Sequence, residues 1–387
     1  MKSNIKIKLI ILAVITVVLF TGCGSENPAN KTDTNINNTE SETSDNMSET
    51  AKITQTETEQ TANITGPKTI AADDKSYFFG ISPTDSNYIS DEEWANYKLI
   101  GIKTLRIHLQ ASHSWDDYDK VAQRAAKEGI EVMMLVSYES YTGKSESINL
   151  GWGPIMHFTN SPDLIDVLAK AIPHFKNEGV TAWEIWNEEN GMWNLTPDEY
   201  ASLITQVYEK CKYTDKWDEN ATIVFGGIDA VNVGFSQGIN SGSGDWLTRF
   251  YKTDAYKAFK EKYNRSPFDV MAVHPYNTID ADANLNVTEN DLQTALKGVV
   301  LNNMKRNGDE NMPVWLTELG DQNSDDAKNA KILELYMKTA YDIPQVTRFH
   351  WFKYYYEGSD YSIVNPDGTP RPSLYAYAQV VKDLTGK

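Results

Sequence analysis

Residues 181–204 read TAWEIWNEENGMWNLTPDEYASLI, and this stretch contains one complete unit of the expected fold. Its first six residues are mostly apolar and β-prone, which predicts a buried strand over residues 181–186. Thr196 and Pro197 come after a polar segment and are residue types that begin a helix. A strand that is followed by a helix is the repeating unit of α/β proteins.

The same order of strand and helix recurs along the chain from Ile70 onward. Helix signals include Ser90 with Glu93, which form a capping box, and Ser161-Pro162, which begin a helix. The other strand-like apolar runs cover residues 77–81, 104–109, 131–137, 222–227, 269–274, 313–318 and 347–352. Eight such units over about 310 residues predict a closed (β/α)8 barrel, the TIM-barrel architecture. An open doubly wound sheet is the alternative, but no Gly-rich phosphate loop follows the first run.

The N-terminus has the pattern of an export signal, over residues 1–22. Three lysines in the first eight residues precede an apolar run, residues 9–20, which is too short to span a bilayer. The sequence Leu19-Phe20-Thr21-Gly22-Cys23 resembles a bacterial lipobox, which implies lipidation of Cys23. An ordinary secretory signal is the alternative. We expect the protein at the extracellular face of the bacterial cell membrane, held there by a lipid anchor.

The remaining chain divides into a tether and a single catalytic domain. Residues 23–66 are rich in Ser, Thr, Asn and Glu and poor in apolar residues, which predicts a disordered linker. Residues 67–387 are expected to form the barrel. Cys23 and Cys211 are the only cysteines, so lipidation of the first would leave no disulfide.

The composition narrows the class of ligand. The formal net charge is −18, which disfavours nucleic acid because phosphate binding needs clustered Lys and Arg. Ten Trp and 21 Tyr residues suit a protein that presents flat rings to a ligand, although a large core uses aromatic residues too. We therefore expect a neutral substrate as the partner. We also expect a monomer that contacts the membrane through its lipid alone.

Two strand ends carry carboxyl groups, and active sites of such barrels lie at the carboxyl ends of the strands. The fourth strand continues into Asn187-Glu188, and alternation predicts that Glu184, Trp186 and Glu188 share one face. The seventh strand ends in Glu318. Glycoside hydrolysis needs such a pair: one carboxyl protonates the leaving oxygen and the other attacks the anomeric carbon. In retaining enzymes the two lie about 5–5.5 Å apart.

Trp-Asn-Glu at the end of the fourth strand and Thr-Glu at the end of the seventh resemble the clan of retaining (β/α)8 glycoside hydrolases. That clan includes families 5, 39 and 51, and the resemblance covers residues 70–387 without selecting one family. It implies that Glu188 is the acid/base, that Glu318 is the nucleophile and that Asn187 binds the sugar 2-hydroxyl. No cofactor or metal is implied.

Further motifs extend the resemblance to other strands. The Leu-Arg-Ile around Arg106 resembles the clan's inward arginine, which keeps the nucleophile ionised. His-Pro-Tyr implies that Tyr276 contacts the nucleophile while His274 approaches the substrate. His-Trp on the eighth strand implies that Trp351 forms the floor of a sugar subsite.

Other acidic and aromatic residues compete for roles in the site. Glu184 lies deeper in the barrel and is expected to pair with Arg106, and Glu189 is expected to point away from the site. Trp152 and Trp193 fall in expected loops and are candidate sugar platforms. Trp183 and Trp315 lie on strands, and we expect both side chains to face the helices. The histidine spacings form no zinc motif.

Two other functions remain compatible with these features. A carbohydrate-binding surface lipoprotein would also be exported and acidic, but it has no need for both Glu188 and Glu318. A transglycosylase that remodels exopolysaccharide would share the chemistry and differ in its products.

Overall fold

The computed structural model describes residues 70–141, 145–149, 154–158, 161–191, 193–229, 243–276, 278–281, 287–290, 292 and 296–386. All of them belong to one compact unit, residues 62–387. The expected signal peptide and linker, with Cys23, lie outside the described residues, as does Trp152. Among the described helices we find none with the length and apolar character that crossing a bilayer requires.

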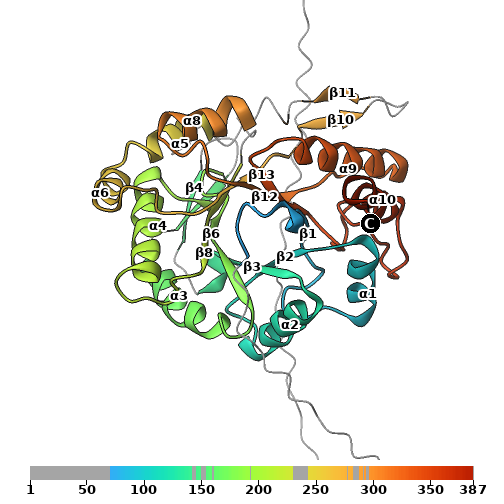
Figure 1. The fold of residues 1–387 in the computed structure, drawn as a ribbon, viewed down its shortest axis with the longest axis horizontal. Coiled ribbons are helices and arrows are strands. Elements are labelled where there is room, and N and C mark those ends of the chain that lie inside the picture. Colours follow the sequence, from blue (N-terminus) through green and yellow to red (C-terminus); the bar gives the residue numbers. More distant parts are fainter. Residues whose placement is uncertain are drawn as a thin grey trace, which may run out of the picture. The chain divides into compact units, whose positions relative to one another are not determined.

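Within the described residues, eight parallel strands close into a barrel, so the TIM-barrel prediction is confirmed (Figure 1). Each of the eight expected strands overlaps one barrel strand. Their hydrogen-bonded order is β1-β13-β12-β9-β8-β6-β3-β2. The bounds are β1 Phe79–Ile81, β2 Thr104–His108, β3 Glu131–Val136, β6 Val180–Asn187, β8 Thr222–Asp229, β9 Met271–His274, β12 Val314–Leu319 and β13 Val346–Trp351.

Helices surround the barrel and cover the outer face of its strands (Figure 1). The Ser90 side chain accepts a hydrogen bond from the Glu93 amide, but Glu93 Oε1 accepts from the Thr84 amide, so only half of the expected capping box forms there. Thr196 forms a full capping box with Glu199. The bounds are α1 Asp91–Ile100, α2 Trp115–Glu128, α3 Ser161–Phe175, α4 Pro197–Lys212, α5 Ser243–Phe250, α6 Asp254–Tyr263, α8 Asn302–Arg306, α9 Asp326–Tyr341 and α10 Pro372–Thr385. A π-helical segment, Leu296–Leu301, precedes α8.

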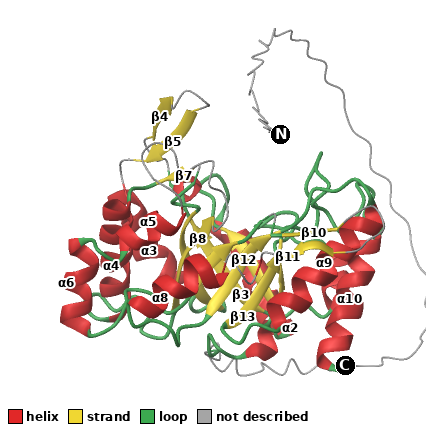
Figure 2. Ribbon diagram, turned by 90° about the horizontal axis from the view of Figure 1, so that it is seen from above, coloured by secondary structure: helices red, strands yellow, loops and turns green. Residues whose placement is uncertain are grey.

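Two small sheets lie outside the barrel. One joins β4 (Ser145–Asn149), β5 (Pro154–Phe158) and β7 (Trp193–Asn194), beyond one end of the barrel strands (Figure 2). The other pairs β10 (Ile279–Ala281) with β11 (Val287–Asn290). We did not predict these strands from the sequence, because each has at most five residues, too few to show a clear apolar period.

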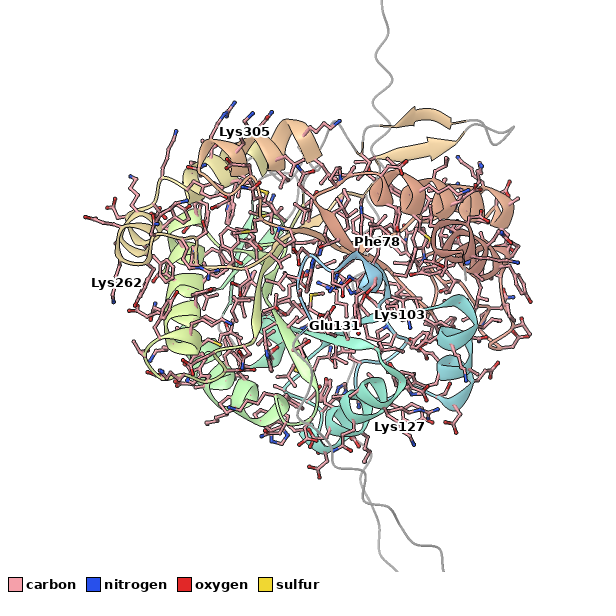
Figure 3. All side chains as sticks on the ribbon, viewed as in Figure 1. Phe78, Lys103, Lys127, Glu131, Lys262 and Lys305 are labelled. Carbon is pink, nitrogen blue, oxygen red and sulfur yellow. The ribbon has the colours of Figure 1, made fainter. Side chains whose placement is uncertain are left out.

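The amino-terminal end of the barrel is closed by an ion pair and by the chain that enters it. Arg348 and Glu131 are both buried and lie 2.7 Å apart, and Glu131 projects among the barrel strands (Figure 3). Arg348 also donates to the carbonyl oxygens of Ala71 and Asp74. Lys127, Lys262 and Lys305, by contrast, project from the outer helices (Figure 3).

Trp183 faces the helices as expected, but Trp315 does not. The Trp183 ring contacts Phe175 of α3. Trp315 is buried inside the barrel, where its ring N–H donates to Ala72 O and Thr347 Oγ1. Strict alternation back from Glu318 placed Trp315 outside, and register shifts within β12 break that alternation. The prediction for Trp315 was therefore wrong.

Replacing Arg348 with methionine is expected to lower the free energy of unfolding by about 3–5 kcal/mol, because Glu131 would remain buried without its cation. Urea denaturation measures this loss. Lys120→Met removes an exposed ion pair with Asp117 and is the control, with a much smaller expected effect. A loss for Arg348→Met no larger than that of the control would contradict the role of this pair.

Candidate active site

Glu318, near the end of β12, is held by two hydrogen-bond donors. Arg106 Nη1 of β2 lies 2.7 Å from Glu318 Oε2, and the Tyr276 hydroxyl lies 2.8 Å from Glu318 Oε1. Burial alone would raise the pKa of Glu318, but the charges of Arg106 and His274 and the two hydrogen bonds outweigh it and lower the pKa. Glu318 is therefore kept as a carboxylate.

Arg106 is itself fixed by three acceptors from three side chains. Besides Glu318, its Nε lies 2.6 Å from Glu184 Oε2, and its Nη2 lies 2.8 Å from Asn187 Oδ1. The Glu184 carboxylate is completely buried, as expected for a residue that pairs with Arg106 and takes no part at the surface. Because the Asn187 oxygen accepts from Arg106, its amide NH2 is left to donate into the site.

Glu188 lies opposite Glu318, against a buried histidine. His274 Nδ1 is 3.1 Å from Glu188 Oε1, and His274 Nε2 is 3.1 Å from Thr317 Oγ1. Burial lowers the pKa of His274, but the charge of Glu318 and the contact with Glu188 raise it above its usual value. One side-chain atom each of Glu188, His274 and Glu318 lie within 4.8 Å of one another.

The three atoms could in geometric terms hold a cation. The guanidinium of Arg106, 2.7 Å from Glu318, makes this a poor place for one, since the cation would meet a fixed positive charge. The arrangement is better suited to two carboxyl groups that act on the two atoms of one bond.

Backbone geometry explains how β6 delivers successive side chains to the site. Trp186 has φ 79° and Glu188 has φ 47°, both in the left-handed region. This interrupts the alternation, so that Asn187 and Glu188 both line the cavity while Trp186 is buried in the core. The expectation that Trp186 shares a face with Glu184 and Glu188 was therefore wrong.

Both carboxyl groups open into a cavity of about 440 Å³. Most of its wall comes from the ends of β2 and β3 and from the segments that follow β1, β2, β3 and β13. They include Ser82, Pro83, Thr84, Asp85, Ser86, Asn87, His108, Gln110, His113, Leu135, Ser137, Tyr138, Glu139, Phe352, Lys353 and Tyr356. The cavity is mostly polar, as a site for sugar hydroxyls requires.

A polar cluster on the β2–β3 side of this cavity was not predicted from the sequence; it consists of His108, Gln110, Ser137 and Glu139. Glu139 Oε2 accepts from Gln110 Nε2 at 3.0 Å and lies 3.1 Å from His108 Nδ1. His108 Nε2 is 2.8 Å from Ser137 Oγ, and burial is the main cause that lowers the pKa of His108 to about 4. The sequence places these polar residues at or just after the ends of β2 and β3, but it does not show that they contact one another.

The structure places the other candidate residues as follows. Trp351 is fully buried with its ring N–H 3.2 Å from Tyr361 O, and it does not line the cavity, so it is not the floor of the sugar site. His274 is also fully buried and does not line the cavity, but it contacts Glu188, which does. The backbone of Trp193 lies in β7, and its side chain is outside the described part, as is all of Trp152. Glu189 is buried and does not line the cavity.

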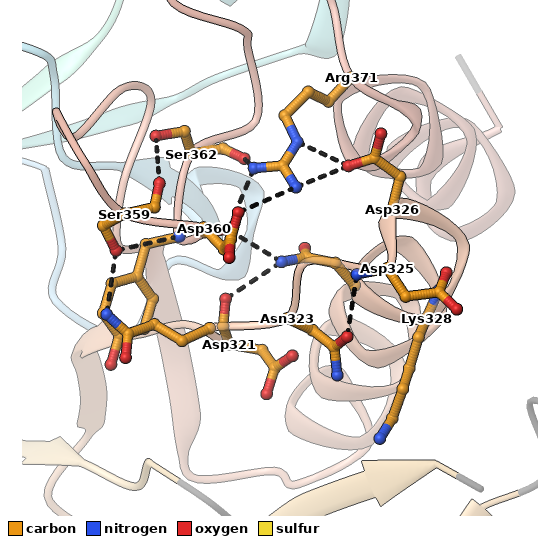
Figure 4. Close-up of polar contacts among 12 residues, drawn as sticks. Asp321, Asn323, Asp325, Asp326, Lys328, Ser359, Asp360, Ser362 and Arg371 are labelled. Atoms are coloured by element: carbon orange, nitrogen blue, oxygen red, sulfur yellow. Dashed lines mark hydrogen bonds and ion pairs between the residues drawn. The ribbon is translucent and has the colours of Figure 1, made fainter. Parts of the chain in front are cut away.

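Polar contacts connect the loops that follow β12 and β13 (Figure 4). Asn329 Nδ2 donates to the carbonyl oxygens of Asp321 and Asp360, at 3.0 Å each. Arg371 adds a bond from Nε to Asp326 Oδ1 at 2.7 Å and another to Ser362 O at 3.1 Å. These contacts tie the loop after Glu318 to the segment that supplies the far wall of the cavity.

Comparisons with known proteins agree with this geometry. A family model described as the glycosyl hydrolase catalytic core matches residues 112–377. A GH128 (subgroup II) endo-β-1,3-glucanase from Sorangium cellulosum is 16% identical, covers 78% of this chain and 98% of its own, and has a TM-score of 0.50. A GH30 endoxylanase from Clostridium papyrosolvens is 14% identical, with 82% and 73% covered and a TM-score of 0.53. These identities show a common fold alone. No curated protein matches significantly.

Proposed function

The chain belongs to the glycosyl hydrolase catalytic core family and is a glycoside hydrolase, and from this premise we propose that it cleaves β-linked glycans with retention of configuration. The β linkage is proposed because the Sorangium enzyme with the same fold is an endo-β-1,3-glucanase. The choice among families 5, 39 and 51 stays a prediction.

The observation that carries the retaining mechanism is the separation of the two carboxyl groups. Oxygens of Glu188 and Glu318 lie within 4.8 Å, close to the separation of about 5–5.5 Å in retaining enzymes. An inverting enzyme needs roughly 6.5–9.5 Å, since a water must fit between the carboxyl group and the sugar. The short distance between the two side chains therefore supports retention, in which no water has to fit between carboxyl group and sugar in the first step.

The unequal surroundings of the pair assign the two roles. Two negative charges this close repel each other, and Arg106 and Tyr276 stabilise the single charge on Glu318. Glu318 attacks the anomeric carbon while Glu188 gives its proton to the leaving oxygen, and a glycosyl ester on Glu318 forms. Glu188 then takes a proton from water, which attacks the anomeric carbon and releases Glu318. Asn187 donates from its amide to a sugar hydroxyl.

A panel of β-glucans, xylans and mannans tests the proposal. We expect at least one of them to be cleaved by the soluble part of the chain, from residue 67. Tight binding without any cleavage would favour the carbohydrate-binding lipoprotein instead. Longer products than the starting oligosaccharides would favour the transglycosylase.

Removing the Tyr276 hydroxyl should move the acidic limb of the pH profile of kcat/KM, its low-pH side, to higher pH. Activity falls as pH drops through the pKa of Glu318, because the protonated carboxyl cannot attack. Tyr276→Phe removes a hydrogen bond to the charged form of Glu318, one of the causes that lower its pKa, and so raises that pKa. Rates from about pH 3 to about pH 7 measure the shift.

Tyr361→Phe is the matched control for this shift. Its ring contacts Tyr276 at 5.9 Å between centroids, yet its hydroxyl makes no hydrogen bond to Glu318 within the described residues. The acidic limb should move much less in this variant. An unchanged limb in Tyr276→Phe, or one that moves to lower pH, would contradict the role of the tyrosine.

We also propose that the enzyme is exported and lipid-anchored through Cys23. In the producing cell, Cys23→Ala should move most of the enzyme from the membrane fraction to the medium, with kcat unchanged. The support is the lipobox-like sequence Leu19-Phe20-Thr21-Gly22-Cys23. Cys211→Ala is the control, because that thiol is buried in α4. Retention of Cys23→Ala in membranes would contradict the anchor.

A further inference from the structure

A second groove adjoins the catalytic cavity on its β1 side. It has a volume of about 190 Å³ and shares two wall residues, Thr84 and Asp85, with the cavity. Its other wall residues are Tyr88, Ser90, Glu92, Glu93, Tyr354, Tyr355, Val364, Asn365, Pro366 and Gly368. The segment after β13 also borders both hollows, since Lys353 and Tyr356 line the cavity. A chain that leaves the cavity over Asp85 therefore enters the second groove directly.

The shared wall is held in place from three sides. Ser86 Oγ accepts from the His108 amide at 2.8 Å, and the Thr84 amide donates to Glu93 Oε1 at 2.9 Å. The Tyr354 amide donates to Ser82 O at 2.9 Å. The relation between the two hollows is thus set before any ligand binds, which lowers the cost of ordering on binding.

The groups around the second groove suit a neutral sugar. The Tyr88 side chain is 66% exposed and Tyr356, on the cavity side, is 47% exposed, so two flat rings are open to stack on sugar faces. The Asp85 carboxylate at the shared wall makes no hydrogen bond within the described residues and can accept from sugar hydroxyls. Of the described residues that line the groove none is Lys or Arg, which disfavours an anionic sugar.

We propose that this groove is a distal subsite for the same glycan chain, with Tyr88 as its stacking platform. The substrate is then a neutral β-linked chain that occupies the catalytic cavity, crosses Asp85 and ends or continues over Tyr88. This inference rests on the proposed function and extends it, because it makes chain length a determinant of specificity.

Initial rates on β-linked oligosaccharides, from disaccharide to octasaccharide, test the subsite. For the wild type, kcat/KM should rise once the chain is long enough to reach the groove. Tyr88→Ala should lower kcat/KM by about tenfold for the long chains and leave the short ones unchanged, whereas Tyr88→Phe should retain the rise. Tyr375→Ala removes a tyrosine that is 59% exposed and lines neither hollow, and it should behave as wild type.

Equal losses at all chain lengths, or no loss in Tyr88→Ala, would overturn the subsite. Calorimetric binding of the octasaccharide to Glu318→Gln, with and without Tyr88→Ala, decides the inference separately from catalysis. Weaker binding by about tenfold in the double variant supports it, and unchanged binding contradicts it. Failure of the wild type to cleave any oligosaccharide would instead contradict the proposed function.

Discussion

Glu318→Gln is expected to lower kcat by about 10⁴-fold or more, with little change in the free energy of unfolding. The amide has nearly the shape of the carboxylate but cannot attack the anomeric carbon, so no glycosyl ester forms. Steady-state rates on the best glycan of the panel measure the loss. Glu219→Gln, an exposed surface change, is the control for the substitution itself.

A smaller variant at the same position makes this prediction sharper. Glu318→Gly leaves space where the nucleophile stood, and Glu188 can still protonate the leaving group. Azide added to this variant should attack the anomeric carbon from the vacated side and give an α-glycosyl azide from a β-glycoside. A Glu318→Gln rate within tenfold of wild type, or no azide product from Glu318→Gly, would contradict the assignment.

Glu188→Ala should lower kcat/KM on natural glycans by about 10²–10⁴-fold, because their leaving oxygen needs a proton. An aryl glycoside with an acidic phenol needs no such help, so its first step should stay fast. The glycosyl ester on Glu318 should then accumulate, because no base activates water. A burst of phenol followed by a slow phase would show this, and azide should speed the slow phase and give a β-glycosyl azide.

Glu189→Gln is the matched control for Glu188. Its carboxyl is next in the chain but fully buried, and burial raises its pKa well above the usual value, which favours the uncharged form that an amide resembles. The neutral amide should therefore retain most of the activity. The acid/base assignment would be contradicted if kcat/KM fell further in Glu189→Gln than in Glu188→Ala. It would also be contradicted if Glu188→Ala lowered kcat/KM equally on glycans and on aryl glycosides.

The barrel could be predicted because each strand is recognisable in the sequence as a short apolar run followed by a helix signal. The pairing of Glu188 with Glu318 followed from the rule that all strand ends face one side. The side of the barrel wall to which the Trp315 and Trp186 side chains point could not be predicted. It depends on register shifts in β12 and a left-handed residue in β6, which strict alternation does not foresee.

The walls of the cavity were harder to predict than its catalytic pair. His108, Gln110 and Glu139 come together only because the segments after β2 and β3 fold against each other. Nothing in their spacing reveals that contact. Trp351 was misplaced for a related reason: its ring N–H finds a partner at Tyr361, which buries the ring beneath the loop.

In the proposed mechanism Glu318 forms a covalent bond to the anomeric carbon, and the short distance between Glu188 and Glu318 supports it. The anomeric configuration of the first product, followed by proton NMR from the start of hydrolysis, tests it most directly. Cleavage of a β-linked glycan with retention should give the β-anomer first, and the α-anomer should appear later by mutarotation. Initial formation of the α-anomer would contradict it.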